Sequence, residues 1–415
     1  MPPGEISRRE FLKGAAAAAA GGALLLAACL LPGCPGPARQ GESPGGGPAQ
    51  AMPPPGDRKV ILVVFGGGCR SSESIDDPNH SHIPRLWGEL VPRGTLFTNM
   101  RVEGAVVHPN STGSILTGHR EWDDLDWSRP VAHPTVFEIF RKCRGAADTE
   151  AWAFVYASIL AGVGLSRAEG YGADWAANVV EPPTIPRATA DEMDRLLREA
   201  AAKGDANAES AAAARAAGLA RSASRISAAG LRSPRGREFL QSRYDAWKAS
   251  GGSTSHDAFL TDAALAAMRE FAPAVLAVAF GEIDCAHYGS WSRYVEAIRR
   301  TDELTWRLWR AAEELDAYRG RTLMLILPDH GRELERPGGD GFIHHSDFYT
   351  GRGADEGCRR VWMLALGPGV PAGARVGRPV PITAAAATAL GYLGLPPSPG
   401  AEKPASWSAA AQPPL

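Results

Sequence analysis

Two short segments of the sequence place a carboxylate beside an imidazole. In the segment Gly-Glu-Ile-Asp-Cys-Ala-His-Tyr-Gly, Asp284 and His287 lie three residues apart, and further along the chain Asp329 directly precedes His330. Oxygen and nitrogen donors at this spacing suit zinc or manganese. Each pair taken singly is more often a structural hydrogen-bonding pair. Their occurrence together, with His344 and His345 following, favours a metal site.

These residues follow short apolar runs that have the length of buried strands. The runs are residues 60–65, 152–157, 274–280, 323–327 and 361–366. Segments with helical spacing separate them, at 83–89, 111–116, 136–142, 291–315 and 383–393. This alternation predicts an α/β fold with a mostly parallel sheet sandwiched by helices. Ligands of such sheets bind beyond the carboxyl ends of the strands, where Asp284 and Asp329 are expected.

The order of the motifs resembles the alkaline phosphatase superfamily, which includes sulfatases, nucleotide phosphodiesterases and cofactor-independent phosphoglycerate mutases. The resemblance extends over about residues 59–395. It rests on the opening strand, on Ile83-Pro84-Arg85-Leu86, on residues 94–99 and 109–118, and on the Asp/His motifs.

This resemblance implies two neighbouring metals and assigns ligands to each. The first metal would be held by Asp284, His287 and His345, with His344 as the alternate. Asp329 and His330 would hold the second metal, together with a carboxylate that ends the first strand and with the nucleophile itself. We expect one or two divalent ions, zinc first and manganese as the alternative.

The sequence departs from the family pattern at the last two of these positions. Gly66, Gly67 and Gly68 stand where the first-strand carboxylate is expected, and a glycine has no side chain that could bind a metal. The acidic residues that could substitute are Glu73, Asp76 and Asp77.

At the nucleophile position, counting back from Thr117 with the spacing of sulfatases reaches His108, whereas alignment on Pro109 reaches Val107. Three interpretations stay open. His108 is a replacement metal ligand or a nucleophile, Ser111 or Thr112 serves instead, or the site is not catalytic. With His108 as a ligand, water would attack the ester directly. A formylglycine mechanism is not supported, because the sequence contains no Cys-x-Pro-x-Arg.

Arg70 follows the glycines and is the expected cation for the negative charge that develops on a phosphate or sulfate ester. The alternative for Arg70 is a surface charge or a salt-bridge partner. The predicted catalytic residues are therefore His108, Arg70 and Thr112.

The amino-acid composition limits the classes of protein to which the chain can belong. The chain has 415 residues, of which 44 are Lys or Arg and 46 are Asp or Glu, giving a formal net charge of −2. This balance argues against a basic nucleic-acid binder, and 44% hydrophobic residues exclude a chain disordered throughout.

The N-terminus resembles a twin-arginine export signal. Arg8 and Arg9 precede Phe-Leu-Lys and then a weakly hydrophobic run rich in Ala and Gly. Leu26-Ala27-Ala28-Cys29 resembles a lipobox, with Cys34 as a poorer candidate for acylation, and a lipid on Cys29 would tether the protein to a membrane.

The predicted organisation has five parts: a signal peptide at 1–34, a Pro/Gly-rich linker at 35–56, an α/β domain at 57–400, a helical cap insert within it at 188–250, and a disordered tail at 401–415. We expect an exported hydrolase of phosphate or sulfate esters, periplasmic or on the outer face of the cytoplasmic membrane, with a small-molecule or polymer substrate and no nucleic-acid partner. The alternatives are a catalytically degenerate metal-binding surface lipoprotein of the same fold, and a cell-wall- or carbohydrate-binding lipoprotein without metal.

Overall fold

The computed structural model describes residues 51–182, 202, 234–250, 255–286, 291–334 and 356–407. Its strands are β1 Lys59–Val64, β2 Thr95–Arg101, β3 Ala151–Val155, β4 Asn178–Val180, β5 Val275–Ala279, β6 Thr322–Leu327, β7 Arg360–Leu366, β8 Ala374–Val376 and β9 Val380–Pro381. Its α-helices are α2 His108–Thr117, α3 Val136–Arg144, α6 Pro234–Ala249, α7 His256–Glu270, α8 Trp291–Glu314, α10 Glu356–Arg359 and α11 Ala384–Tyr392.

Together these strands form one nine-stranded sheet within the described residues, in the order β4-β3-β5-β1-β6-β7-β2-β8, with β9 also pairing with β2. The five strands from β4 to β6 are parallel to one another, whereas β7 is antiparallel to both β6 and β2. The predicted α/β fold with a mostly parallel sheet is therefore confirmed. The antiparallel position of β7 is a refinement that apolar runs alone could not give.

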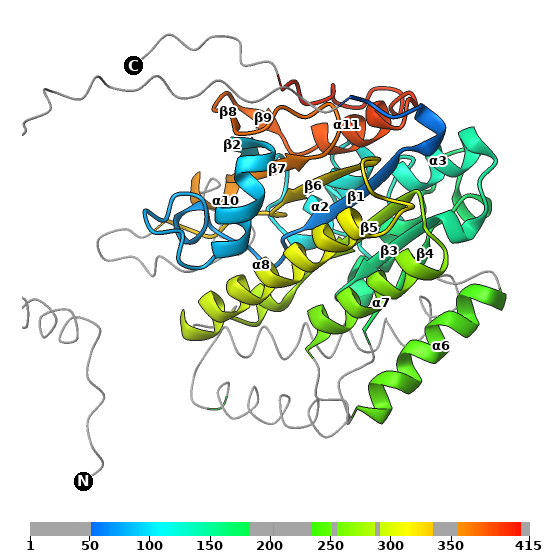
Figure 1. The fold of residues 1–415 in the computed structure, drawn as a ribbon, viewed down its shortest axis with the longest axis horizontal. Coiled ribbons are helices and arrows are strands. Elements are labelled where there is room, and N and C mark those ends of the chain that lie inside the picture. Colours follow the sequence, from blue (N-terminus) through cyan, green and yellow to red (C-terminus); the bar gives the residue numbers. More distant parts are fainter. Residues whose placement is uncertain are drawn as a thin grey trace, which may run out of the picture. The chain divides into compact units, whose positions relative to one another are not determined.

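Helices cover both faces of the sheet because the strand residues alternate between two cores. Val60, Leu62 and Val64 of β1 belong to the core shared with α2, α3 and α11. Ile61 and Val63 belong to the core shared with α7 and α8. Figure 1 shows α7 and α8 together on one face of the sheet. Central strands buried on both faces explain why their sequences are continuous apolar runs.

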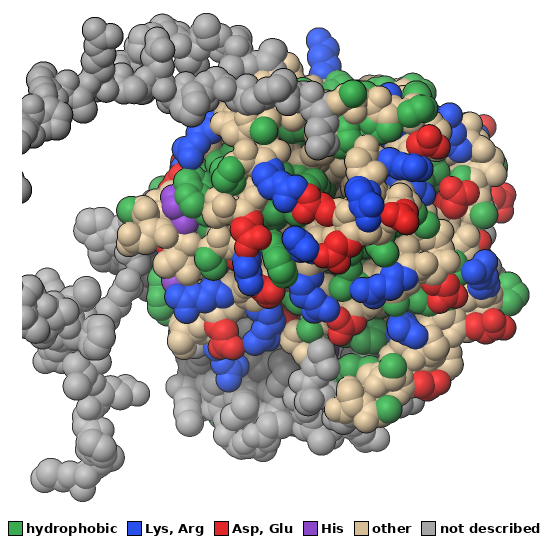
Figure 2. Space-filling model, viewed as in Figure 1, with side chains coloured by type: hydrophobic (Ala, Val, Ile, Leu, Met, Phe, Trp, Pro, Cys, Tyr) green, Lys and Arg blue, Asp and Glu red, His purple; other side chains and the backbone are tan. Residues whose placement is uncertain are grey.

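The surface over α8 mixes charges of both signs (Figure 2). Arg300 pairs with Glu282 and Glu296, and Arg310 pairs with Glu314 one turn along the helix. Exposed pairs of this kind each contribute about 0.5 kcal/mol or less. The near-neutral net charge is thus distributed as neighbouring opposite charges on this face.

The structure describes parts of two further predicted segments. Helix α6 lies within the predicted insert at 188–250, most of whose remaining residues lie outside the described part. Residues 401–407 were predicted as the start of a disordered tail, but they pack on the domain. The Glu402 backbone N–H donates to the Gly118 carbonyl (3.2 Å), the Ala405 N–H donates to Thr388 Oγ1 (2.8 Å), and Trp407 meets Phe97 edge-on. Burial of Ala405 and Trp407 explains the order of this segment.

The free energy of unfolding should depend on pH through the buried carboxyl of Asp302 in α8. This carboxyl accepts hydrogen bonds from the backbone N–H groups of Arg85 (2.9 Å) and Leu86 (2.8 Å). Burial raises the pKa of Asp302 to about 7, although these N–H donors oppose the shift. The resulting penalty on the folded state is present above pH 7 and disappears as the pH falls toward 4. We predict that Asp302→Asn removes up to about 4 kcal/mol of this pH dependence from the free energy of unfolding.

Urea unfolding at pH 4.5 and 7.5 measures this effect. The wild-type chain should lose stability between the two pH values relative to the Asn variant. Glu296→Gln, an exposed change on the same helix, is the control and should leave the difference as in wild type. Equal pH dependence in wild type and Asp302→Asn would contradict the prediction.

Candidate functional site

Four of the predicted site residues meet at the carboxyl edge of the parallel strands. Asp284 lies in the 3-10 helix η8 (Glu282–Ala286) after β5, and Asp329 and His330 follow β6. Strand β1 pairs with both β5 and β6, so these loops leave the sheet on either side of its end. The fourth residue, His108, enters from the first turn of α2.

Local sequence explains the position of His108. Val107 is extended and precedes the helix, Pro109 fits the first turn, and Gly118 ends the helix in the left-handed conformation with φ of 80°. His108 is therefore the first helical residue, and it is 6% exposed. Of the two positions considered from the sequence, Val107 lies at the helix cap and His108 reaches the cluster.

The donor atoms of three residues form a small triangle. His108 Nδ1 lies 2.5 Å from Asp329 Oδ2 and 3.0 Å from His330 Nε2, and His330 Nε2 lies 3.9 Å from Asp329 Oδ2. Neighbouring ligands of a tetrahedral zinc ion are roughly 3.3 Å apart. The three separations bracket this value, so two imidazole nitrogens and one carboxylate oxygen fit a divalent metal with at least one position left open.

The surrounding contacts orient both imidazoles. His330 Nδ1 lies 2.8 Å from the Gly331 carbonyl, which fixes the proton on that nitrogen and directs the Nε2 lone pair into the triangle. His108 Nε2 lies 3.2 Å from Asp284 Oδ1. Both ring nitrogens of His108 therefore face carboxylates, Asp329 on one side and Asp284 on the other.

The pKa values of the two histidines shift in opposite directions. Burial by itself lowers the pKa of His108, but the Asp284 and Asp329 carboxylates outweigh it and raise the pKa to about 10. His330 is fully buried, and its burial lowers its pKa to about 4 despite the nearby Asp329. Burial also opposes ionisation of Asp329, yet His330 and His108 keep the pKa of Asp329 low. The site thus holds a neutral His330 beside an ionised Asp329, as metal binding requires, whereas His108 carries a proton at neutral pH that a bound metal would displace.

Gly66 and Gly67 approach the neighbouring loop too closely for any side chain. A Cβ on Gly66 would lie 1.8 Å from the Phe280 carbonyl oxygen, and one on Gly67 would lie 2.3 Å from the Asp284 backbone nitrogen. A carboxylate at Gly66 or Gly67 would therefore require the segment from Phe280 to Asp284 to move. This packing accommodates glycine, and not the expected first-strand ligand, at these two positions.

The acidic residues considered as substitutes are engaged elsewhere. Glu73 binds Arg70, Asp76 pairs with Arg360 at 2.6 Å, and Asp77 accepts hydrogen bonds from Ser81.

Arg70 is buried and bound rather than open to a substrate. Its Nε and Nη2 donate to the two carboxylate oxygens of Glu73 at 2.6 and 2.7 Å, and its Nη1 donates to the Glu333 carbonyl at 2.8 Å. This geometry corresponds to the salt-bridge alternative that the sequence left open. Ser111 and Thr112 are both 1% exposed within α2. His287, His344 and His345 lie outside the described residues.

Three residues that belong to no sequence motif also help to build this edge of the sheet: Tyr156, Asp257 and Arg332. The ring of Tyr156 meets His108 edge-on, with centroids 6.0 Å apart. Asp257 is fully buried and accepts the N–H groups of Gly281 (3.0 Å) and Glu282 (2.9 Å), at the turn that leads to Asp284. The sequence places Tyr156 inside the apolar run 152–157, whereas in the structure β3 ends at Val155 and Tyr156 follows it. Asp257 and Arg332 act through long-range contacts.

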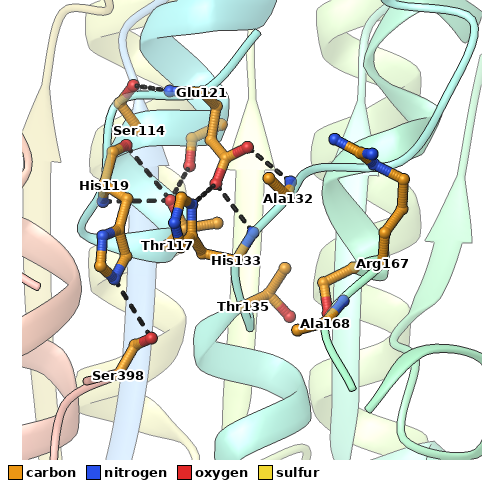
Figure 3. A network of polar contacts seen from close by, with 12 residues as sticks. Ser114, Thr117, His119, Glu121, Ala132, His133, Thr135, Arg167, Ala168 and Ser398 are labelled. Carbon is orange, nitrogen blue, oxygen red and sulfur yellow. Dashed lines mark hydrogen bonds and ion pairs between the residues drawn. The ribbon is translucent and has the colours of Figure 1, made fainter. Parts of the chain in front are cut away.

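A second group of histidines is separate from this cluster (Figure 3). His119 and His133 stack at 3.9 Å, His119 Nε2 lies 3.1 Å from Ser398 Oγ, and His133 Nδ1 lies 2.8 Å from the buried Glu121 carboxylate. These contacts link the end of α2 to the segment before α3 and to the C-terminal residues. Neither histidine was given a role from the sequence.

Comparison with known proteins gives a signal match and a set of distant structural similarities. Residues 5–24 match the family model of the twin-arginine translocation pathway signal sequence, as predicted. No curated protein matches the chain. Among the described residues, no helix combines the length and apolar character needed to cross a membrane.

The similar solved structures include enzymes that act on esters. A sulfatase from Pseudoalteromonas sp. is 13% identical, with 81% of this chain and 68% of that chain covered and a TM-score of 0.46. The phosphonate monoester hydrolase of Agrobacterium radiobacter is 16% identical over 82% and 74% of the two chains, with a TM-score of 0.45. A protein of the alkaline phosphatase superfamily from Vibrio parahaemolyticus is 11% identical over 84% and 69%, with a TM-score of 0.43.

Removal of one donor should abolish tight metal binding. We predict that Asp329→Asn and His330→Ala each weaken Zn²⁺ affinity by at least about 100-fold, because the triangle then offers two donors. Isothermal titration of the metal-free chain with Zn²⁺ measures this. His119→Ala, a histidine outside the cluster, is the control and should bind as wild type does. Unchanged affinity in both cluster variants would show that the zinc lies elsewhere.

Proposed function

We propose that the chain is an exported, metal-dependent hydrolase of phosphate or sulfate esters, related to the alkaline phosphatase superfamily. The observation on which this depends is the triangle of His108 Nδ1, Asp329 Oδ2 and His330 Nε2 at the carboxyl edge of the sheet. Its members occur in the chain order of that superfamily, with Asp284 beside them. The donor set favours zinc, with manganese as the alternative.

His108 is proposed as a metal ligand and not as the nucleophile. A histidine nucleophile needs one ring nitrogen whose lone pair faces the ester. Here Nδ1 faces Asp329 and His330, and Nε2 faces Asp284. The attacking group is then a water molecule. This is the replacement-ligand interpretation of the position that the sequence left open.

A carboxylate of the cluster is needed to accept the proton of the attacking water. The Asp284 side chain is 27% exposed, whereas that of Asp329 is 1% exposed, so Asp284 is the carboxylate of the cluster that water can reach. With a single ion bound, we assign to Asp284 the proton that the attacking water loses. A bound divalent ion supplies the positive charge that offsets the negative charge developing on the ester oxygens.

A second ion bound by Asp284, His287 and His345, with His344 as the alternate, remains part of the proposal. Arg70 is proposed to act on the site through Glu73 and the Glu333 carbonyl, and Thr112 to support α2. Acylation of Cys29 and the spacer at 35–56 would hold the domain at the outer face of the cytoplasmic membrane, where a small-molecule or polymer ester could reach it.

One observation favours a second candidate function. Main-chain atoms lie where a side chain on Gly66 or Gly67 would be, and the nucleophile position is a histidine enclosed by carboxylates. A metal-binding surface lipoprotein of the same fold, without turnover, would have these two features.

Hydrolysis assays separate the two functions. We predict that the zinc-loaded chain cleaves aryl phosphate, aryl phosphodiester or aryl sulfate, that chelation abolishes cleavage, and that His108→Ala and Asp329→Asn lower kcat/KM by at least about 1,000-fold. His119→Ala should retain wild-type activity. Stoichiometric zinc without turnover on any of the three substrates would favour the surface lipoprotein.

Export should depend on the two arginines of the matched signal. We predict that the double change Arg8→Lys and Arg9→Lys retains the chain in the cytoplasm, because the paired guanidinium groups are the recognised feature. Fractionation followed by immunoblotting measures the distribution. Cys29→Ala should still be exported but should leave the membrane fraction, and equal export of the Lys-Lys variant and wild type would contradict the assignment.

A further inference from the structure

Arg332 is a cation buried inside the wall of the candidate site. It lies two residues beyond His330, has no exposed surface, and is among the largest fully buried side chains of the described residues. Its guanidinium lies 4.7 Å from the centroid of the Tyr294 ring. Burying a charged group without compensation is costly, so a guanidinium at this depth requires specific contacts.

Those contacts join three loops of the site. Arg332 Nε donates to the Gly68 carbonyl at 2.8 Å, and Nη2 donates to the carbonyls of Gly67 at 3.0 Å and Ile283 at 2.9 Å. Gly67 and Gly68 follow β1, Ile283 follows β5, and Arg332 itself follows β6. One planar side chain thus connects the ends of three adjacent strands.

Two of the connected loops carry the carboxylates of the cluster, and the third, after β1, contacts one of these carboxylates. Ile283 directly precedes Asp284, whose carboxylate lies 3.2 Å from His108 Nε2. The Gly68 N–H lies 3.4 Å from Asp329 Oδ1, whose partner oxygen Oδ2 lies 2.5 Å from His108 Nδ1. The separation of the two carboxylates on either side of His108 therefore depends on how the three loops are held together.

The glycine triplet acquires a role from the same geometry. Its residues let β1 approach Phe280 and Asp284 closely, and its carbonyl groups receive the guanidinium. A side chain at Gly67 would push the Asp284 backbone away. The glycines and Arg332 thus form one packed unit, in which the guanidinium lies against main-chain carbonyl groups that no side chain covers.

We propose that Arg332 is a positioning residue, whose hydrogen bonds to Gly67, Gly68 and Ile283 hold Asp284 and Asp329 at the spacing needed to place His108 for metal binding. This inference rests on the proposed function, since it assigns a role within the same site. Arg332 acts through the loops and does not itself touch the substrate.

The test compares Arg332→Met and Arg332→Lys with Arg141→Met. Arg141 is a matched control, because it is also a buried arginine that donates to main-chain carbonyls, here those of Ala176 at 2.7 Å and Ala146 at 3.3 Å, and none of these belongs to the site. Both Met variants should lower the melting temperature. Only Arg332→Met should weaken Zn²⁺ affinity, by about 10–100-fold, the range known for residues that orient metal ligands. Arg332→Lys, which keeps the charge and can reach one or two carbonyls, should recover part of the affinity.

A second measurement does not need metal. Hydrogen exchange of the metal-free chain should speed up in peptides covering 66–71 and 280–286 in Arg332→Met, and should stay at the wild-type rate there in Arg141→Met. Wild-type zinc affinity in a folded Arg332→Met chain overturns the proposal. If the wild-type chain itself binds no zinc, the proposed function fails, and unchanged exchange in the two peptides then overturns the positioning role separately.

Discussion

Two carboxylates converge on one buried imidazole, and the carboxyl edge of the sheet is organised around this arrangement. Asp284 and Asp329 would repel each other if nothing positive lay between them, because charges in a poorly solvated interior interact strongly. His108 lies between them, with one nitrogen facing each. A positive charge at this point, whether a proton on His108 or a divalent ion, offsets this repulsion.

The surrounding structure follows from that requirement. Helix α2 must begin at His108, which the extended Val107 and the proline after His108 permit. The ends of β1, β5 and β6 must be adjacent, as the ladders on both sides of β1 ensure. Asp257 secures the turn after β5 through two N–H groups, and Arg332 ties this turn to the glycines. Rigid elements thus hold the donors, and the loops between them are braced by buried polar contacts.

The sequence predicts those parts that local pattern determines. The central strands are continuous apolar runs, and Asp329 with His330 follows one of them directly, so both could be recognised. His108 could be reached by its spacing from Thr117, but its role could not be chosen among three, because the choice depends on carboxylates more than 170 residues away. Strand β2 was not predicted, because apolar and polar residues alternate little along it and because it contains the polar residues Thr98 and Asn99. The contacts of Arg332 and Asp257 are long-range, and no local pattern encodes them.

The two edges of the sheet are short within the described residues. Strand β4 at one end and strand β8 at the other have three residues each, and β9 adds two more beside β2. A long open edge offers a row of free backbone groups on which a second molecule can form another strand. Proteins that use the twin-arginine route fold in the cytoplasm and remain there in the folded state until they are transported across the membrane. Brief edge strands would limit self-association during that interval, so the outline of the sheet suits a chain that must remain dispersed until it is transported.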